Sequence, residues 1–164
     1  GLSDRITCYL TFNVMELPNA YTTESPTGTS IQDFTNWNVT VDGNAYGYWG
    51  EWKSILEKPS QIGYIRSHQQ ILVEAAEPTE ISSMILSYTR GYTYSGKAYI
   101  ETSLDGESFK KDELELPNST AQFVSFRKPV KAKYIRITFA DGYFSNYNGA
   151  ILNRLKIYTP STEE

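Results

Sequence analysis

The feature that most limits what this chain can fold into is a set of short runs in which mostly apolar residues alternate with mostly polar ones. A period of two places every second side chain on one face of a strand, so the runs predict sheets with one face against a core. No long stretch has the periodicity of a helix. The inward positions are Met84, Leu86 and Tyr88 in one run, Ala98, Ile100 and Thr102 in a second (with Tyr99, Glu101 and Ser103 facing outward), and Ile135, Ile137 and Phe139 in a third.

Turn residues separate the predicted strands. Asp-Gly pairs begin at Asp42, Asp105 and Asp141, and Gly tolerates the positive φ that a tight turn requires. Regularly spaced strands and turns predict an all-β fold, either a sandwich or a jelly roll.

The chain suits a single domain over residues 1–164, because 40% of its residues are hydrophobic and no linker divides it. Within this domain, residues 1–38 are expected to form atypical N-terminal strands and a loop. The loosest part, residues 16–36, is interpreted as a long surface loop because it is rich in Pro, Thr and Ser. Residues 159–164 are expected to be a frayed tail.

Composition and charge argue against several classes of function. The net charge of −4 and the absence of a Lys/Arg block favour no nucleic-acid partner. No apolar run is long enough for a membrane span. Cys8 is the only cysteine, which excludes an internal disulfide and a multi-cysteine zinc site. Its strand-like surroundings predict a buried, unreactive thiol.

Six segments in order, over about residues 39–158, resemble the discoidin domain, also called the coagulation-factor (F5/8) type C domain, whose family includes galactose-binding-like carbohydrate-binding modules. The segment most similar to the family is Tyr99 to Phe109, a strand followed by Ser-x-Asp-Gly-x-x-aromatic. The others are residues 41–49, 71–81, 86–90, 133–137 and 155–158. The resemblance implies a jelly-roll β-sandwich of the galactose-binding-domain type that holds its ligand on loops at one end.

The resemblance also implies a site. In sugar-binding members an Arg, an Asn five residues later, a His and an aromatic residue of the last loop form it. Arg90 matches the Arg, Ser95 stands where Asn is expected, and Phe144 and Tyr143 match the stacking aromatic. His68 is on the expected side of the sequence for the His. The predicted ligand-binding residues are Arg90, Tyr92, Tyr94, Ser95, Tyr143, Phe144, Asn146, Tyr147 and His68, with Asn148 beside them.

These residue types suit a sugar, because an aromatic ring covers the apolar face of a pyranose while Arg and amide groups orient its hydroxyls. Structural roles compete with this interpretation. Arg90 would equally suit a strand surface, the loop aromatics would suit the covered end of a sandwich, and His68 suits an ordinary structural or surface position. In a second aromatic cluster, Trp49 is expected in the core and Tyr46 and Tyr48 at the rim of a site.

The resemblance implies a structural calcium in many members, held near the Asp-Gly turn with a Glu from the final strand. Here Asp42 is present, but Gly47 replaces a Thr and Arg154 stands at the Glu position. A cation in the ligand shell repels calcium, which needs oxygen donors. No metal and no cofactor are therefore expected.

No nucleophile elbow, zinc-protease helix or phosphate-binding Gly loop occurs in the sequence, so the chain is not expected to be an enzyme. The first hypothesis is a carbohydrate-binding module, extracellular or on a cell surface, with a glycan or glycoconjugate as partner. The second is an adhesion or scaffold domain that binds protein or lipid, or packs beside a neighbouring catalytic domain of a larger surface protein. A stand-alone hydrolase is the most distant hypothesis, since two carboxylates can meet in space without a sequence motif.

Overall fold

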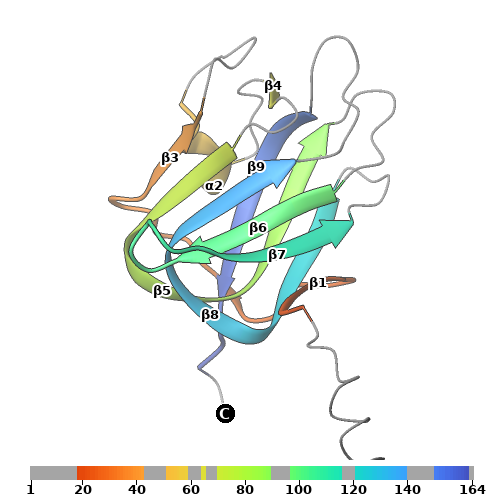
Figure 1. Ribbon diagram of the computed structural model, residues 1–164. Helices are drawn as coiled ribbons and strands as arrows, with labels where there is room; N and C mark the ends of the chain where they lie inside the picture. Colours follow the sequence, from red (N-terminus) through yellow and green to blue (C-terminus); the bar gives the residue numbers. More distant parts are fainter. Residues whose placement is uncertain are drawn as a thin grey trace, which may run out of the picture.

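The computed structural model describes residues 18–42, 51–58, 64–65, 70–89, 97–115, 121–139 and 150–162. These residues form an antiparallel β-sandwich of two layers (Figure 1), so the predicted all-β jelly-roll class is confirmed. The strands are β1 (Ala20–Thr23), β2 (Thr29–Ser30), β3 (Asn38–Val41), β4 (Tyr64–Ile65), β5 (Gln70–Thr89), β6 (Lys97–Ser103), β7 (Lys110–Glu115), β8 (Ala121–Phe139) and β9 (Ala150–Thr159). One short helix, α2 (Ser54–Glu57), accompanies them in the described part.

Two long strands, β5 and β8, bend from one layer into the other and so connect both layers by hydrogen bonds (Figure 1). Residues 70–74 of β5 pair with residues 134–138 of β8, and residues 83–87 pair with 121–125. The register shifts twice between these regions, and Pro78 and Pro129 lie beside the shifts. Proline has no N–H for a ladder, so irregular pairing is where a long strand accommodates it.

The two halves of β5 and β8 form the centre of each layer. The front layer has the order β3, β5, β8, β6, β7. The back layer has the order β9, β5, β8, β1, and β2 and β4 both pair with the other edge of β9. Every pairing among the described strands is antiparallel.

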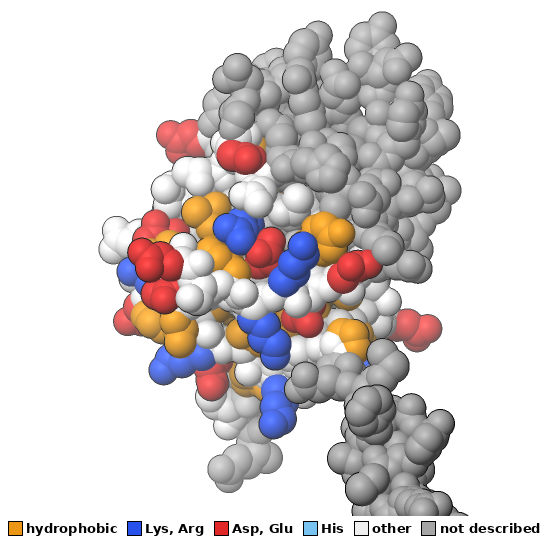
Figure 2. Space-filling model, viewed as in Figure 1, with side chains coloured by type: hydrophobic (Ala, Val, Ile, Leu, Met, Phe, Trp, Pro, Cys, Tyr) orange, Lys and Arg blue, Asp and Glu red, His pale blue; other side chains and the backbone are white. Residues whose placement is uncertain are grey.

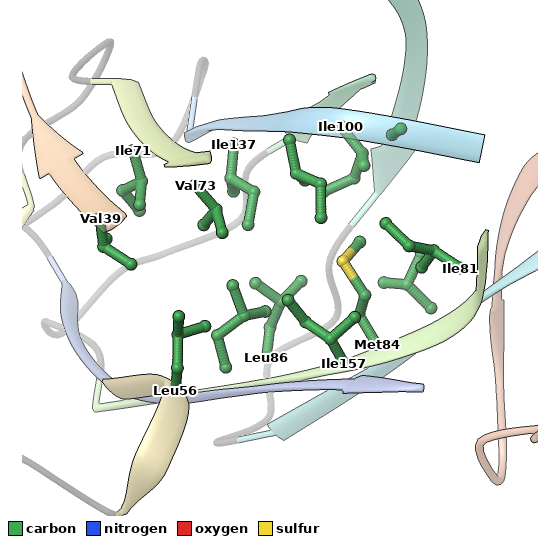
Figure 3. Close-up of a cluster of buried hydrophobic side chains, with 14 of the residues drawn as sticks. Val39, Leu56, Ile71, Val73, Ile81, Met84, Leu86, Ile100, Ile137 and Ile157 are labelled. Carbon is green, nitrogen blue, oxygen red and sulfur yellow. The ribbon is translucent and has the colours of Figure 1, made fainter. Parts of the chain in front are cut away.

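The core lies between the layers and follows the alternation in the sequence (Figure 3). Ile71, Val73, Ile100 and Ile137 point inward from the front layer, and Ile81, Met84, Leu86 and Ile157 from the back layer. The predicted inward positions Ala98, Thr102 and Ile135 are also buried; the side chains of Tyr88 and Phe139 lie outside the described part. Of the outward set, Glu101 and Ser103 are only 9% and 5% exposed, although Glu101 lies on the outer face beside Arg136. Neighbouring side chains on the outer face cover Glu101.

One open side of the sandwich is closed by α2 and the segment that leads into β3. Ile55 and Leu56 of α2 are buried, as is Trp52 just before it. Phe34 and Trp37 pack edge to face with ring centroids 5.1 Å apart. These rings fill the space between the edges of the layers. A helix of four residues is too short to be stable alone, so the burial of its side chains stabilises α2.

The interpretation of residues 16–36 as a long surface loop is wrong in the described part. Residues 20–23 and 29–30 are strands, which pair with β8 and β9, and Ala20 is buried. Between them, Thr27 N–H donates to the Ser83 hydroxyl (2.9 Å), and the Ser82 hydroxyl donates to the Thr27 carbonyl (2.6 Å). These buried serines fix the segment to β5 although it lacks an apolar pattern of its own.

At the other end of the chain, Thr159 pairs with Thr29, so β9 continues one residue into the tail expected to fray. Residues 1–17, with the predicted buried Cys8, lie outside the described part, as do 163–164.

Candidate functional site

All nine predicted ligand-binding residues lie outside the described part of the structure, in segments 66–69, 90–96 and 140–149. Their side chains are therefore not placed, and the site they form stays a prediction. Trp49, Tyr46 and Tyr48 lie outside it as well. The strand residues that flank these segments are described, and their register tests whether the segments start and finish near one another.

The ends of segments 90–96 and 140–149 are neighbours in the sheet. Thr89, the last residue of β5, pairs with Ile151 at the start of β9. Ala98, near the start of β6, pairs with Phe139 at the end of β8. Each end of one segment thus adjoins an end of the other, at the end of the sandwich away from the bends of β5 and β8 (Figure 1).

The strand ends on either side of residues 66–69, the segment that contains His68, lie at the same end of the sandwich. Ile65 of β4 pairs with Ala150, the first residue of β9, and Gln70 of β5 pairs with Thr138 of β8. The strand ends before and after residues 66–69 therefore lie beside both strand ends that flank residues 140–149.

The start of segment 43–50 is held to the same strand end. Asp42 N–H donates to the carbonyl of Gln70 (3.1 Å), and the Gln70 N–H donates to the Asp42 carboxylate. Asp42, which directly follows β3, is thus hydrogen-bonded in both directions to Gln70, the first residue of β5.

A pocket that the sequence did not predict lies on the side of the sandwich closed by α2. It has a volume of about 390 Å³ and is lined by residues 31–35, Lys53, Leu56, Glu57 and Arg154. Three separate segments contribute these residues. Nothing in the sequence pattern indicates that these three segments meet.

Charged groups of both signs line this pocket. The hydroxyl and the N–H of Thr35 both donate to Asp33 Oδ1 (2.6 and 3.0 Å). The side-chain bond, the backbone bond and the charge of Lys53 lower the pKa of Asp33 below its ordinary value. Arg154 Nη2 lies 3.5 Å from the carbonyl of Glu57, and its Nε is buried without a hydrogen-bond partner.

The described residues at the expected calcium site do not fit that metal. Arg154, at the position of the implied Glu, brings a guanidinium that donates toward a main-chain carbonyl, and the Asp42 carboxylate accepts an N–H. No group of three or more His, Cys, Asp or Glu side chains with metal-binding geometry occurs within the described ranges. Calcium requires several oxygen donors around one point.

The outer face of the front layer carries interleaved acidic, basic and hydrophobic side chains (Figure 2). Arg136 Nη2 lies 2.6 Å from Glu101 Oε2, and the Phe109 ring lies 3.8 Å from the guanidinium. Lys111 lies 3.7 Å above the ring of Tyr99. These contacts connect β6, β8 and the residues of β7 and just before it, and Arg136 Nε is buried without a hydrogen-bond partner.

Antiparallel jelly-roll sandwiches of this kind occur among lectin domains, a class of binding modules. The F5/8 type C domain model matches residues 21–157. The chain belongs to the F5/8 type C domain family. The match starts at Tyr21, whereas the resemblance in the sequence began near residue 39, because strands β1 and β2 have little sequence pattern.

Solved structures share this fold. A family 32 carbohydrate-binding module of Clostridium perfringens NanJ, in complex with galactose, superposes with a TM-score of 0.63 at 16% identity, over 79% of this chain and 97% of that one. A family 32 module, CpGH89CBM32-5 from the same organism, in complex with GalNAc-β-1,3-galactose, has a TM-score of 0.57 at 17% identity, over 79% and 99%.

A two-domain protein of unknown function from Bacteroides fragilis has a TM-score of 0.65 at 12% identity, over 87% of this chain. The present chain spans about half of that protein, 48% of its length. A search of curated protein sequences finds no match. No helix in the described ranges is long and apolar enough to cross a membrane.

Proposed function

We propose that this domain is a non-catalytic carbohydrate-binding module that binds a glycan on the loops 90–96 and 140–149. The observation that carries the proposal is the register of the flanking strands, Thr89 with Ile151 and Ala98 with Phe139. It brings the ends of both segments to the same edge of the sandwich. Membership of the F5/8 type C family and the likeness to modules in complex with galactose and GalNAc-β-1,3-galactose support a glycan as ligand.

The residues of the two segments supply the chemistry that a sugar needs. Phe144 and Tyr143 offer flat apolar faces for a pyranose ring, with Tyr92, Tyr94 and Tyr147 as further aromatic surface. Arg90 donates to ring hydroxyls from a fixed planar fork. The shorter hydrogen-bonding groups are Ser95, Asn146 and His68. No step in this assignment requires a nucleophile, a metal or a cofactor.

Isothermal titration of the domain with galactose and N-acetylgalactosamine, after a glycan array, tests the proposal. Shallow module–sugar contacts correspond to an affinity of about −4 to −6 kcal/mol, in the high micromolar to millimolar range. Arg90→Ala and Phe144→Ala should each abolish detectable binding, because removing an anchor costs on the order of 1–3 kcal/mol.

Leu104→Ala is the matched control. Leu104 is 55% exposed and follows β6 at the end of the sandwich opposite Lys97. It should leave both binding and the melting temperature unchanged. Normal binding of a confirmed glycan by both loop variants would place the site elsewhere. Unfolding of both would assign Arg90 and Phe144 to the core.

We place the module outside the cell or at its surface, beside other domains of a longer protein. The two-domain Bacteroides fragilis chain, and a Clostridium perfringens ZmpB chain that holds two family 32 modules and of which this domain spans 43%, support the neighbouring domains. The second candidate is a scaffold domain that packs beside a neighbouring catalytic domain; these two chains support only the presence of a neighbouring domain. A domain that binds no glycan on an array but binds a neighbouring domain of its own protein would establish that role.

A further inference from the structure

The pocket beside α2 has the size of a small-molecule site and a mainly polar lining. Its volume of about 390 Å³ is within the range of about 300–1,000 Å³ typical of such sites. None of its lining residues belongs to the loops proposed to bind a glycan. Arg154 pairs in the sheet with Ser87, in the body of the back layer rather than at the strand ends Thr89 and Ala150.

Of the two cations of this pocket, Arg154 forms no ion pair with a described residue, whereas the charge of Lys53 acts on Asp33. Arg136, on the opposite layer, is paired with Glu101 at 2.6 Å. Arg154 has only the main-chain carbonyl of Glu57 at 3.5 Å, which is the outer limit of a hydrogen bond. Lys53 lines the same pocket, and its charge lowers the pKa of Asp33. A guanidinium binds a carboxylate through two parallel N–H···O bonds, so an added carboxylate would be the natural partner of Arg154.

The other lining groups suit hydroxyls. Thr35 occupies only Oδ1 of Asp33, so Oδ2 remains to accept a hydroxyl from a ligand. The Gln32 amide and the exposed Glu57 carboxylate lie on the same lining. Two carboxylates would repel a compact, multiply charged anion such as phosphate. A ligand with one carboxylate and several hydroxyls meets both requirements.

We infer that this pocket is a second ligand site, for an acidic sugar of the uronic acid type, in which Arg154 and Lys53 bind the carboxylate and Asp33 and Gln32 bind ring hydroxyls. The inference stands on the pocket alone and does not depend on the glycan site proposed for the loops.

The test is a titration followed by amide NMR, with sodium D-galacturonate as the probe, D-galactose as the neutral sugar of matched shape and acetate as a carboxylate without a ring. Galacturonate should shift the amide signals of residues 32–35 and the Nε–H signal of Arg154. Galactose and acetate should leave these signals unchanged at the same concentration. Arg154→Met should weaken galacturonate binding by about tenfold, as expected for a charged hydrogen-bond partner.

Two further variants keep the test decisive if Arg154→Met disturbs α2. Lys53→Met should weaken the same binding by severalfold, while Lys131→Met, which removes one exposed positive charge elsewhere, should not. Unchanged signals at residues 32–35 with galacturonate, or equal responses to acetate, would overturn the acidic-sugar site. Galacturonate binding that shifts Thr89 and Lys97 without any response in the pocket would overturn this inference and leave the loop site standing.

Discussion

Arg136 and Glu101 form a 2.6 Å ion pair between β8 and β6 on the outer face of the front layer, where solvent reaches only 27% and 11% of the two side chains. They are direct cross-strand neighbours in the register. The Phe109 ring covers the guanidinium and keeps water from one of its faces.

Replacing Glu101 with Ala should lower the free energy of unfolding by about 1–3 kcal/mol, because Arg136 would remain largely covered without its partner. Urea denaturation measures the change. Glu80→Ala, at an exposed acidic position of β5, is the control and should change the free energy by less than about 0.5 kcal/mol. Equal effects of the two variants would mean that the pair adds nothing to stability.

Two glycines with positive φ should respond to an added methyl group in a defined order. Gly106 has φ +78°, and a Cβ there would lie 3.1 Å from the ring of Tyr134. Gly28 has φ +97°, and its Cβ would overlap the main-chain oxygen of Thr159 and the hydroxyl of Ser82. A ring can shift, whereas a strand backbone cannot without disturbing β9.

Gly106→Ala should therefore cost about 1–2 kcal/mol of unfolding free energy, and Gly28→Ala clearly more. Chemical denaturation of both variants gives the ranking, with Ser108→Ala in the exposed part of the same turn as a neutral control. The reverse order would contradict the close packing of residue 28 against β9.

The sheets were predictable from the sequence because burial in a strand alternates with a period of two, and Ile100, Ile137 and Leu86 express that period directly. Strands β1 and β2 were not predictable, because their residues carry no apolar alternation. Their pairing depends on distant partners, such as the Ser82 and Ser83 hydroxyls bound to Thr27. Helix α2 is too short to show a helical period.

The candidate sites, like the strands, were predictable from the sequence only in part. The family resemblance pointed to Arg90 and Phe144. The strand register shows that the strands flanking their two segments are neighbours, but it does not place the two side chains. The pocket beside α2 had no signal, because its residues come from three segments whose proximity is known only after folding. Arg154 was noted as an unfavourable calcium ligand, but not as the wall of a pocket.

The turn after β6 should make stability depend on acid pH. Hydrogen bonds from the Ser108 and Glu107 N–H groups and the Ser103 hydroxyl lower the pKa of Asp105 below its ordinary value of 3.8. A group whose pKa is lower in the folded state stabilises the fold above the unfolded-state pKa, and this contribution disappears as the pH falls through the folded-state pKa. The urea midpoint should therefore fall below about pH 4.

Asp105→Asn removes the titrating charge and keeps an oxygen that accepts hydrogen bonds. Its urea midpoint should be lower than that of the unmodified protein at neutral pH, and the difference should shrink as the pH falls below about 4. Glu107→Gln, whose side chain is exposed in the same turn, should follow the pH dependence of the unmodified protein. A difference that stays constant at all pH values would assign the effect to packing instead of charge.

The stability of this domain should not depend on calcium, because Arg154 places a positive charge where the family resemblance implies a carboxylate ligand. The Arg154 guanidinium instead donates toward the carbonyl of Glu57 and so connects β9 to α2 without a metal. Binding of an ion to the folded state alone would raise the melting temperature in proportion to the logarithm of its concentration. The melting temperature is therefore expected to be the same in EDTA and in millimolar calcium. Arg154→Met provides the comparison: it removes the cation without adding an oxygen donor, so its melting temperature should fall equally in both buffers. An increase of several degrees in calcium for the unmodified protein would establish that a calcium site exists despite Arg154.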